Sequence, residues 1–383
     1  MERKGMAVRF EIVSGVDRVD PVLWNRLCWN APPMMEWEYL YCLEKSGVLT
    51  PERGFRPRHL VAYEGQEVVA IAPMYERLRP WVEFGDGGLL RFLAELTGHS
   101  YHVGLMATVP LTPVPAYKVL YGRSRDPRRV YAILSDYIDF ICETHGFATS
   151  RFYFFVDSAP GVHDVLLQKG YVGIRSEYCL WTNKGYGSFE DFLRTFKSSR
   201  RHKIRRELRD IKSRGIRLRM LEGREAPDSL YDRMYDLYIT TWRKYMGQDI
   251  PPFLNRCFFQ MLGERFRHRT IFCTARDDRD LLALAVFYRK KGFLYGRYWG
   301  TYSSVPFLHF ATCYYHPIRY AIEEGIQVFD PGFGGEHKTY RGFGKAAAQH
   351  YIKFYGDEEV RFAHSILGRL SGSTGGVPSH LPR

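Results

Sequence analysis

The same order of expected elements occurs twice along the chain, and this repetition limits the possible folds more than any other feature of the sequence. In each half, hydrophobic periodicity and turn residues predict a strand, two helices, a hairpin, a late helix and a final strand. The first set lies at 9–12, 21–28, 36–46, 58–75, 131–145 and 151–156. The second set lies at 216–220, 229–238, 253–266, 270–288, 307–323 and 326–329. The pattern indicates an internal duplication, with an extra insertion in the first half around 80–128.

A hairpin in the middle of each half and a crossover helix near its end predict a mixed sheet flanked by helices. This is the layout of a GNAT fold, so we expect an α/β protein with two GNAT-like domains in tandem. A chain of 383 residues is long enough for two such cores. The expected boundaries are 1–185 for the N-terminal domain and 186–360 for the C-terminal domain. The Gly/Ser/Pro-rich segment 371–383 is expected to be a disordered tail.

Several classes of protein are excluded by simple patterns. The longest apolar run, at 281–288, is too short to span a membrane, and the first residues lack the features of a secretion signal. The seven cysteines show no C-x-x-C pair and no histidine at ligand spacing, so we expect neither disulfides nor a metal site. The expected location is the cytoplasm.

Positive charge is concentrated in one segment. The chain has 55 Lys+Arg and 42 Asp+Glu residues, a formal net charge of +13, and the segment 197–214 contributes more than half of the excess. A helix expected at 198–214 has one narrow apolar seam and is otherwise basic. Such a helix suits the phosphates of a tRNA, a nucleotide-linked precursor or anionic lipid headgroups, although a merely solvated face is the alternative. Its candidate substrate-binding residues are Arg201, Lys203 and Arg205.

The strand expected at 294–302 carries an arginine among aromatic residues and glycines. Strict alternation would place Tyr295, Arg297 and Trp299 on one face and Tyr298 on the other. The guanidinium group can bind a carboxylate or phosphate with two hydrogen bonds, and glycine permits close approach of a ligand. These four residues are therefore substrate-binding candidates, the alternative being an aromatic packing face with Arg297 in a structural ion pair.

The loop at 330–344 reads DPGFGGEHKTYRGFG and follows the last strand of the second half. Transfer of an acyl group to an amine requires a base and a cation for the developing oxyanion. Glu336 or His337 can provide the base, and Lys338 the cation. His309, at the start of the late helix, is the fourth catalytic candidate. A solvated loop pair and a packed core histidine are the alternatives.

The sequence lacks the usual coenzyme A-binding motif at its expected position. The segment 341–346 fits the letters R-x-x-G-x-A of the pyrophosphate loop of GNAT enzymes. It lies after the last motif, however, whereas the expected position between strand and late helix, 300–306, reads GTYSSVP. Coenzyme A as donor is therefore not supported.

Five motifs together resemble those of the FemAB-like predicted N-acyltransferases, a bacterial family related to peptidoglycan biosynthesis. They are TPV at 112–114, KSSRRHKIRRE at 197–207, YGRYWG at 295–300, PFLHFATCYY at 306–315 and GEHK at 335–338. The resemblance covers about 8–356. It implies a tandem GNAT fold akin to the Fem peptidyltransferases, which move an amino acid from aminoacyl-tRNA onto an amine of a cell-wall precursor. It also implies that Glu336, His337 and Lys338 are site residues.

The leading functional hypothesis is N-acyl or N-aminoacyl transfer to an amine acceptor, possible acceptors including a cell-wall precursor. Acyl-CoA and aminoacyl-tRNA both remain open as donors, and the oligomeric state is not predicted. One alternative is a catalytically silent tandem GNAT module that binds tRNA or an anionic membrane surface. Another is an acyltransferase that uses acyl-CoA and a small amine.

Overall fold

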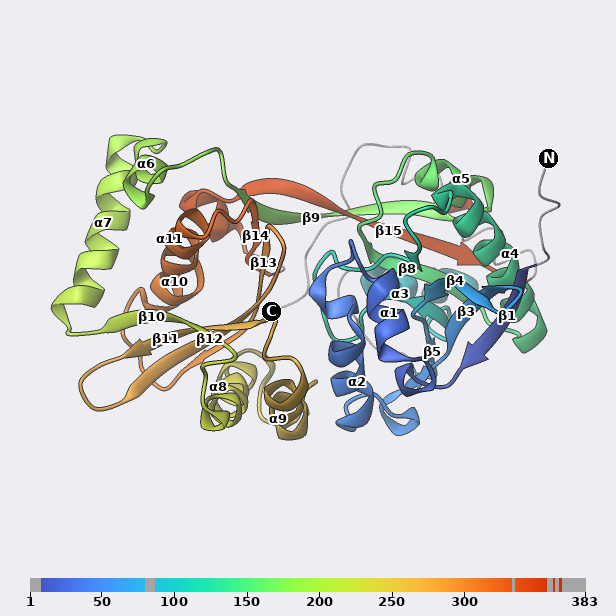
Figure 1. The fold of residues 1–383 in the computed structure, drawn as a ribbon, viewed down its shortest axis with the longest axis horizontal. Helices are drawn as coiled ribbons and strands as arrows, with labels where there is room; N and C mark the ends of the chain where they lie inside the picture. The colour runs from blue at the N-terminus through green and yellow to red at the C-terminus, as the bar shows by residue number, and fades with distance from the viewer. Residues whose placement is uncertain (1–7, 80–86, 333–334, 357–360, 362–364, 367–383) are drawn as a thin grey trace. The chain divides into compact units, whose positions relative to one another are not determined.

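The computed structural model describes residues 8–79, 87–332, 335–356, 361 and 365–366 (Figure 1). The chain divides into two compact units, one formed by Met1–Glu177 with Ala347–Arg383 and the other by Tyr178–Ala346. The sequence placed 178–185 in the first domain and 347–360 in the second, so the two boundaries differ from those expected. Each boundary falls inside one long strand, β9 (Val172–Thr182) or β15 (Gly344–Phe354), where no turn residue marks it. The predicted tail, 371–383, lies outside the described residues.

The first unit contains a four-stranded sheet in the order β1-β3-β4-β7 and a run of strands in the order β15-β8-β6-β5-β2. Its strands before β9 are β1 (Val8–Val13), β2 (Phe55–Pro57), β3 (His59–Glu64), β4 (Glu67–Ala72), β5 (Tyr75–Arg77), β6 (Gly104–Ala107), β7 (Leu120–Tyr121) and β8 (Thr149–Phe155). Its α-helices are α1 (Pro21–Leu27), α2 (Trp37–Lys45), α3 (Gly87–Thr97), α4 (Pro127–His145) and α5 (Val162–Gln168). The elements β5, α3 and β6 lie within or beside the expected insertion.

The second unit contains strands in the order β10-β11-β12-β13-β14-β9. Its strands are β10 (Arg217–Glu222), β11 (Thr270–Arg276), β12 (Leu281–Lys290), β13 (Phe293–Thr301) and β14 (Val328–Asp330). Its helices are α6 (Phe189–Arg194), α7 (Ser198–Ser213), α8 (Asp228–Met246), α9 (Arg256–Arg265), α10 (Leu308–Phe310), the π-helical turn η4 (Ala311–Tyr315), α11 (His316–Glu323) and the 3-10 helix η5 (Glu336–Arg341). The strand, two helices and hairpin that begin each half are present in both units, as the sequence predicted.

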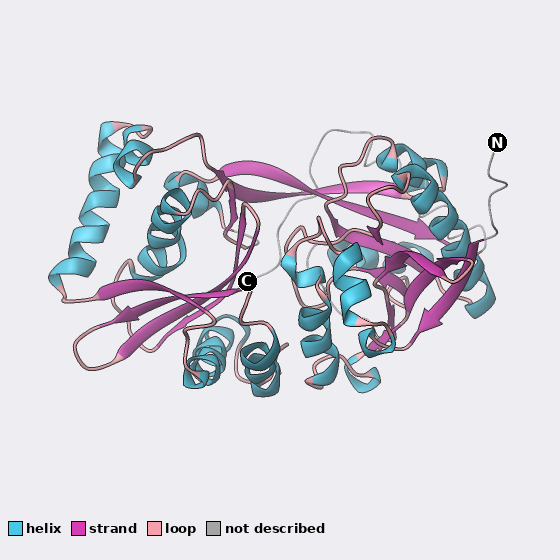
Figure 2. Ribbon diagram, viewed as in Figure 1, coloured by secondary structure: helices cyan, strands magenta, loops and turns pink. Residues whose placement is uncertain are grey.

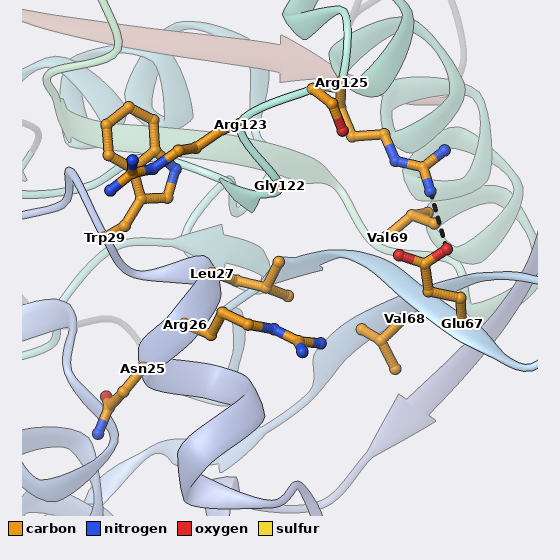
Figure 3. A pocket seen from close by; sticks show the side chains of 11 residues that line it. Asn25, Arg26, Leu27, Trp29, Glu67, Val68, Val69, Gly122, Arg123 and Arg125 are labelled. Atoms are coloured by element: carbon orange, nitrogen blue, oxygen red, sulfur yellow. Dashed lines mark hydrogen bonds and ion pairs between the residues drawn. The ribbon is translucent and has the colours of Figure 1, made fainter.

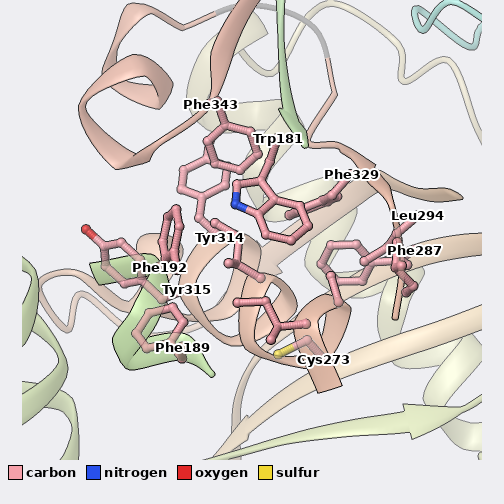
Figure 4. Packing of buried hydrophobic residues seen from close by; sticks show 14 of the residues in the cluster. Trp181, Phe189, Phe192, Cys273, Phe287, Leu294, Tyr314, Tyr315, Phe329 and Phe343 are labelled. Carbon is pink, nitrogen blue, oxygen red and sulfur yellow. The ribbon is translucent and has the colours of Figure 1, made fainter. Parts of the chain in front are cut away.

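Helices cover both faces of the sheet in the second unit (Figure 2). Helices α8 and α9 lie on one face, where Tyr288 packs against Phe266 with ring centroids 5.4 Å apart. The helical segment from α10 to α11 lies on the other face. Its Tyr314 and Tyr315 join a core that also contains Trp181, from β9 (Figure 4). Helices therefore cover the sheet on both faces, and burial of these large aromatic side chains stabilises the packing.

Candidate functional site

Strands β13 and β14 run parallel for three residue pairs and then separate. Their last pair is Tyr295 with Asp330, where β14 ends, while β13 continues to Thr301. Because the two strands no longer pair beyond this point, the space beside β13 is filled by side chains from α10, η4 and η5. His309, His337 and Lys338 lie on these elements, so the separation of the strands determines where the candidate residues meet.

A β-bulge at Arg297 overturns the predicted alternation along β13. Gly296 lies opposite Phe287 and Tyr298 lies opposite Val286, so Arg297 is an inserted residue between consecutive partners on β12. The insertion reverses the side-chain alternation at this position. Tyr295 therefore shares the α8/α9 face with Tyr298, rather than the face of Trp299. The prediction that Tyr295, Arg297 and Trp299 share one face is wrong, since a bulge leaves no simple mark in the sequence.

The faces of β13 are confirmed by ring contacts. Tyr298 packs against Tyr238 of α8 and Phe259 of α9, with ring centroids 5.7 and 5.6 Å apart. Trp299 instead packs against His309, with centroids 4.6 Å apart. Of the four residues predicted on this strand, Trp299 therefore lies beside a predicted catalytic residue, and Tyr298 packs on the opposite face.

His309 and His337 are close to each other. Their ring centroids are 6.2 Å apart, and both rings lie near Tyr314. The Nε2 atom of His337 is 3.0 Å from the Tyr314 hydroxyl oxygen, within hydrogen-bond distance. Gly335 suits this position, because its φ of +85° is rare for other residues and a Cβ atom there would crowd the His337 ring. The structure thus brings His309, His337 and Trp299 together around Tyr314, which the sequence analysis did not select.

Lys338 is buried, with an exposed fraction of 3%. Its Nζ donates a hydrogen bond of 2.6 Å to the carbonyl oxygen of Gly332, and the Gly332 N–H donates one of 2.8 Å to Oδ1 of Asp330. The carboxyl group of Asp330 is equally buried. Asp330 was not selected either, although its position as the last residue of a buried strand was a usable signal.

The electrostatics of the cluster favour neutral histidines. Burial lowers the pKa of His309 to about 3, and the neighbouring His337 and Lys338 act in the same direction. Burial, Lys338 and Arg341 also lower the pKa of His337. Burial lowers the pKa of Lys338, opposed by the negative charge of Asp330. Both imidazoles are therefore unprotonated at neutral pH, and a neutral imidazole can accept a proton.

Burial raises the pKa of Asp330 to about 6, while the Gly332 N–H, Arg297 and Lys338 oppose this effect. Burial likewise keeps the Cys313 thiol protonated by raising its pKa well above the ordinary value. A protonated, buried thiol is a poor nucleophile, so Cys313 has a packing role.

Arg341 connects the site to the basic helix. Its Nη1 donates a 2.8 Å hydrogen bond to the carbonyl oxygen of His337, and its guanidinium carbon lies 3.3 Å from the centre of the Phe310 ring. Glu207, a buried residue of α7, lies 3.7 Å from Nη2 of Arg341 and accepts a 2.5 Å hydrogen bond from Tyr315. This arginine begins the segment whose letters match a coenzyme A loop, yet it is buried and supports η5.

The basic candidates on α7 have different environments. Arg201 donates a hydrogen bond to the carbonyl oxygen of Phe196, and Arg205 forms a 2.6 Å ion pair with Glu190. Lys203 is exposed. Arg206, Arg209 and Lys212 are exposed as well. Within the described part of the chain, none of these four side chains forms an ion pair. We call these four residues the outer stripe of α7.

The side chain of Glu336, the remaining catalytic candidate, lies outside the described residues.

The first unit contains a separate pocket of about 490 Å³ between α1, β4 and the segment after β7 (Figure 3). Leu27, Val68 and Val69 contribute apolar lining, and the guanidinium carbon of Arg123 lies 4.5 Å from the Trp29 ring centre. None of the sequence-predicted residues lines this pocket.

The comparisons with known proteins place the chain in a family. A family model for FemAB-like proteins, described as peptidoglycan biosynthesis/recognition, matches residues 15–366. The chain belongs to the FemAB-like family. This assignment confirms the resemblance inferred from the motifs. No curated protein sequence matches the chain.

Solved structures share the fold of this FemAB-like chain. FemX matches with a TM-score of 0.57 and 9% identity, over 92% of this chain and 98% of the FemX chain. L-PGS from Bacillus licheniformis matches with a TM-score of 0.51 and 10% identity, over 92% and 97% of the two chains. The predicted fold class, an α/β protein with two GNAT-like halves, is therefore confirmed.

Within the described residues, no helix combines the length and apolar character needed to cross a membrane.

Proposed function

We propose that this FemAB-like protein transfers an acyl or aminoacyl group to the amine of an acceptor related to the cell wall. The observation that carries the proposal is the pairing of a neutral His337 with the buried ammonium group of Lys338, beside the point where β13 and β14 separate. Amine acylation needs a proton acceptor and a positive charge near the carbonyl oxygen, and this arrangement offers both. Family membership supports the same chemistry.

In the proposed reaction the amine nitrogen attacks the carbonyl carbon of the donor directly. A new C–N bond forms, the carbonyl oxygen becomes an oxyanion, and Lys338 neutralises it. The amine proton passes to His337, the bond to the leaving group breaks as the carbonyl re-forms, and His337 delivers the proton to the leaving oxygen or sulfur, which departs as a hydroxyl or thiol. When Nε2–H of His337 donates to the Tyr314 oxygen, the basic atom is Nδ1. This atom lies beside Gly335, at the position that a Cβ atom of any other residue would crowd.

The outer stripe of α7 supports a phosphorylated donor. Its four cations follow a helix of 16 residues whose apolar side packs in the core through Ile204 and Ile211. The outer stripe itself has no apolar side chain to insert into a lipid surface, which membrane-binding amphipathic helices require. Arginine also binds phosphate with two hydrogen bonds. We therefore propose an RNA-linked donor, with anionic lipid and acyl-CoA as the alternatives that the experiment separates.

A binding and thermal-shift experiment tests this function. The purified protein is incubated with aminoacyl-tRNA, uncharged tRNA, acyl-CoAs, anionic vesicles or nucleotide-linked cell-wall precursors. A ligand that binds only the folded state raises the unfolding midpoint. We expect a rise with aminoacyl-tRNA, and transfer of its amino acid to an amine-bearing precursor detected by mass spectrometry.

Two variants give this experiment its controls. Lys203→Glu with Arg206→Glu reverses charge on the outer stripe and should weaken tRNA binding and its dependence on salt. Lys338→Met should leave binding intact and abolish transfer. Transfer from acyl-CoA alone would replace the proposed donor. Salt-dependent tRNA binding with no transfer in any condition would instead support the silent binding module.

A further inference from the structure

Each unit contains a buried lysine near a buried aspartate, and each aspartate lies at or just after the end of the strand that follows the late helix, although Lys118 precedes that helix and Lys338 follows it. In each unit a residue before the late helix makes a parallel contact with the strand that follows that helix, as an isolated bridge outside β7 in the first unit and as the pairing of β13 with β14 in the second. The contact joins Tyr117 and Phe155 in the first unit and ends with Tyr295 and Asp330 in the second. The aspartates are Asp157 and Asp330, and their lysines are Lys118 and Lys338. The duplication thus supplies an internal comparison for the candidate site.

In the first unit, the Asp157 carboxylate has hydrogen-bond donors on both of its oxygen atoms. Oδ2 of Asp157 accepts hydrogen bonds from the hydroxyl groups of Tyr121 and Tyr131, at 2.8 and 3.1 Å, and lies 3.4 Å from Nζ of Lys118. Oδ1 accepts a hydrogen bond from the backbone N–H of Ala159. The side chains of Lys118 and Asp157 are only 5% and 3% exposed. A carboxylate with this many donors is satisfied and fixes its surroundings.

The second-unit pair is arranged differently. Oδ1 of Asp330 accepts the Gly332 N–H in the same i to i+2 pattern, but the carbonyl of that glycine receives the Lys338 ammonium group. Gly332 has a φ of +87°, a conformation that suits glycine, and a Cβ atom there would lie 3.3 Å from the Gly296 carbonyl oxygen. Asp330 and Lys338 therefore hold the N–H and the carbonyl group of the same glycine, Gly332.

We propose that Asp330 is a positioning residue that keeps Lys338 charged and correctly placed where β13 and β14 separate, whereas Asp157 has a structural role. A buried ammonium group without a nearby negative charge tends to lose its proton. Asp330 supplies the negative charge, and Gly332 fixes the direction of the ammonium group. This inference rests on the proposed function, in which Lys338 must be cationic to neutralise the oxyanion.

The other ionisable groups around Lys338, Asp330 and the two histidines come from several elements. They are Arg297 on β13, His309 on α10, Cys313 on η4, Cys179 on β9, and His337 and Arg341 on η5. The histidines are neutral at neutral pH and Cys313 is a thiol, while Arg297 lowers the pKa of Asp330 and Arg341 lowers that of His337. The carboxylate of Asp330 is the negative group recorded as raising the pKa of Lys338 most strongly.

The first experiment measures the lysines directly and needs no substrate. Lysine is labelled with ¹³C at Cε, and the resonances are titrated from pH 5 to 12 by NMR; Lys338→Arg and Lys118→Arg assign the two signals. Asp330→Asn should lower the pKa of Lys338 by about one unit or more and leave that of Lys118 unchanged. Asp157→Asn is the matched control, and it should move only the Lys118 resonance.

The wild-type protein provides a second measurement if Asp330→Asn does not fold. The Lys338 resonance should show an additional small inflection near pH 6, where the Asp330 carboxylate takes up its proton. The proposal is overturned if folded Asp330→Asn leaves Lys338 titrating as in wild type, or if that inflection is absent from wild type.

An activity assay then separates this inference from the proposed function. In Asp330→Asn, the loss of kcat/KM at alkaline pH should begin at lower pH, and adding Lys338→Arg should remove that shift because arginine stays charged. An unshifted alkaline limb would contradict the positioning role. If no variant and no wild-type protein transfers an acyl group, the proposed function fails while the NMR result on the pair still stands.

Discussion

Lys338 illustrates how one residue can cost stability and support chemistry. Lysine is almost never fully buried unless it is paired, because removing an ammonium group from water is unfavourable. Here the group is buried, bonded to the Gly332 carbonyl and close to Asp330. Such a costly arrangement is typical of functional sites, where a charge must be held ready in a place that water does not reach.

Substituting Lys338 should therefore lower both activity and stability. We expect Lys338→Met to lower kcat about 100-fold or more, since it removes the positive charge that meets the oxyanion. The unfolding midpoint should fall, because methionine leaves the buried Asp330 carboxylate without its cation and the Gly332 carbonyl without its donor. Steady-state kinetics and thermal unfolding check the two effects. A variant with wild-type kcat would remove Lys338 from the mechanism.

At the scale of elements, the contact of α8 with β13 determines which face of the strand is available. Gly300 lies against the backbone of α8, and a Cβ atom there would be 2.0 Å from the carbonyl oxygen of Leu237. Thr241 of α8 adds a hydrogen bond of 3.0 Å to the carbonyl oxygen of Trp299. The helix is therefore held close to one face of β13, which leaves the other face for Trp299 and His309.

Gly300→Ala should be clearly destabilising. The added methyl group must displace backbone rather than a flexible side chain, so we expect a loss of about 2 to 3 kcal/mol in the free energy of unfolding. Gly296→Ala on the same strand is the matched control. Its Cβ atom would lie 3.3 Å from the Phe287 ring, which can adjust, and the loss should stay below about 1 kcal/mol. Denaturant unfolding of both variants decides the point, and equal losses would contradict the close contact of α8 with β13.

At the scale of the whole molecule, buried histidines make stability depend on pH. Nδ1 of His350 accepts a 3.2 Å hydrogen bond from the Phe154 N–H, and Nε2 lies 2.8 Å from the Ser176 hydroxyl oxygen. Burial lowers the pKa of His350 to about 4 and that of His316 to about 4. Each group takes up a proton more readily when the chain is unfolded.

The sign of the effect follows from the lowered pKa. The stabilising contribution of His350 is complete above its unfolded pKa of about 6.5 and is lost as pH falls through about 4. We expect His350→Gln to reduce the stability lost between pH 8 and pH 4 by up to about 3 kcal/mol, while lowering stability at pH 8. Urea unfolding across this pH range measures the difference. An unchanged pH dependence in the variant would show that His350 is not the group responsible.

Much of the candidate site could be predicted from sequence, because some residues stand in local patterns that are unusual for ordinary packing. A glycine-rich loop after a buried strand identified His337 and Lys338, and an aromatic strand identified Trp299. Tyr314 and Asp330 were missed, because a tyrosine in an apolar helix and an acid at a strand end also occur in ordinary packing. The face assignment of Tyr295 was wrong, because one inserted residue at Arg297 reverses the alternation.

The sequence by itself determined the duplicated order of elements, the mixed α/β class and the family, since these depend on local periodicity and on motifs that survive small boundary errors. The tertiary structure decided the unit boundaries, the bulge in β13, and the different surroundings of the two Lys–Asp pairs. The physical reason is that burial and electrostatic effects depend on residues far apart in the chain, whose approach is decided only when strands pair and helices pack.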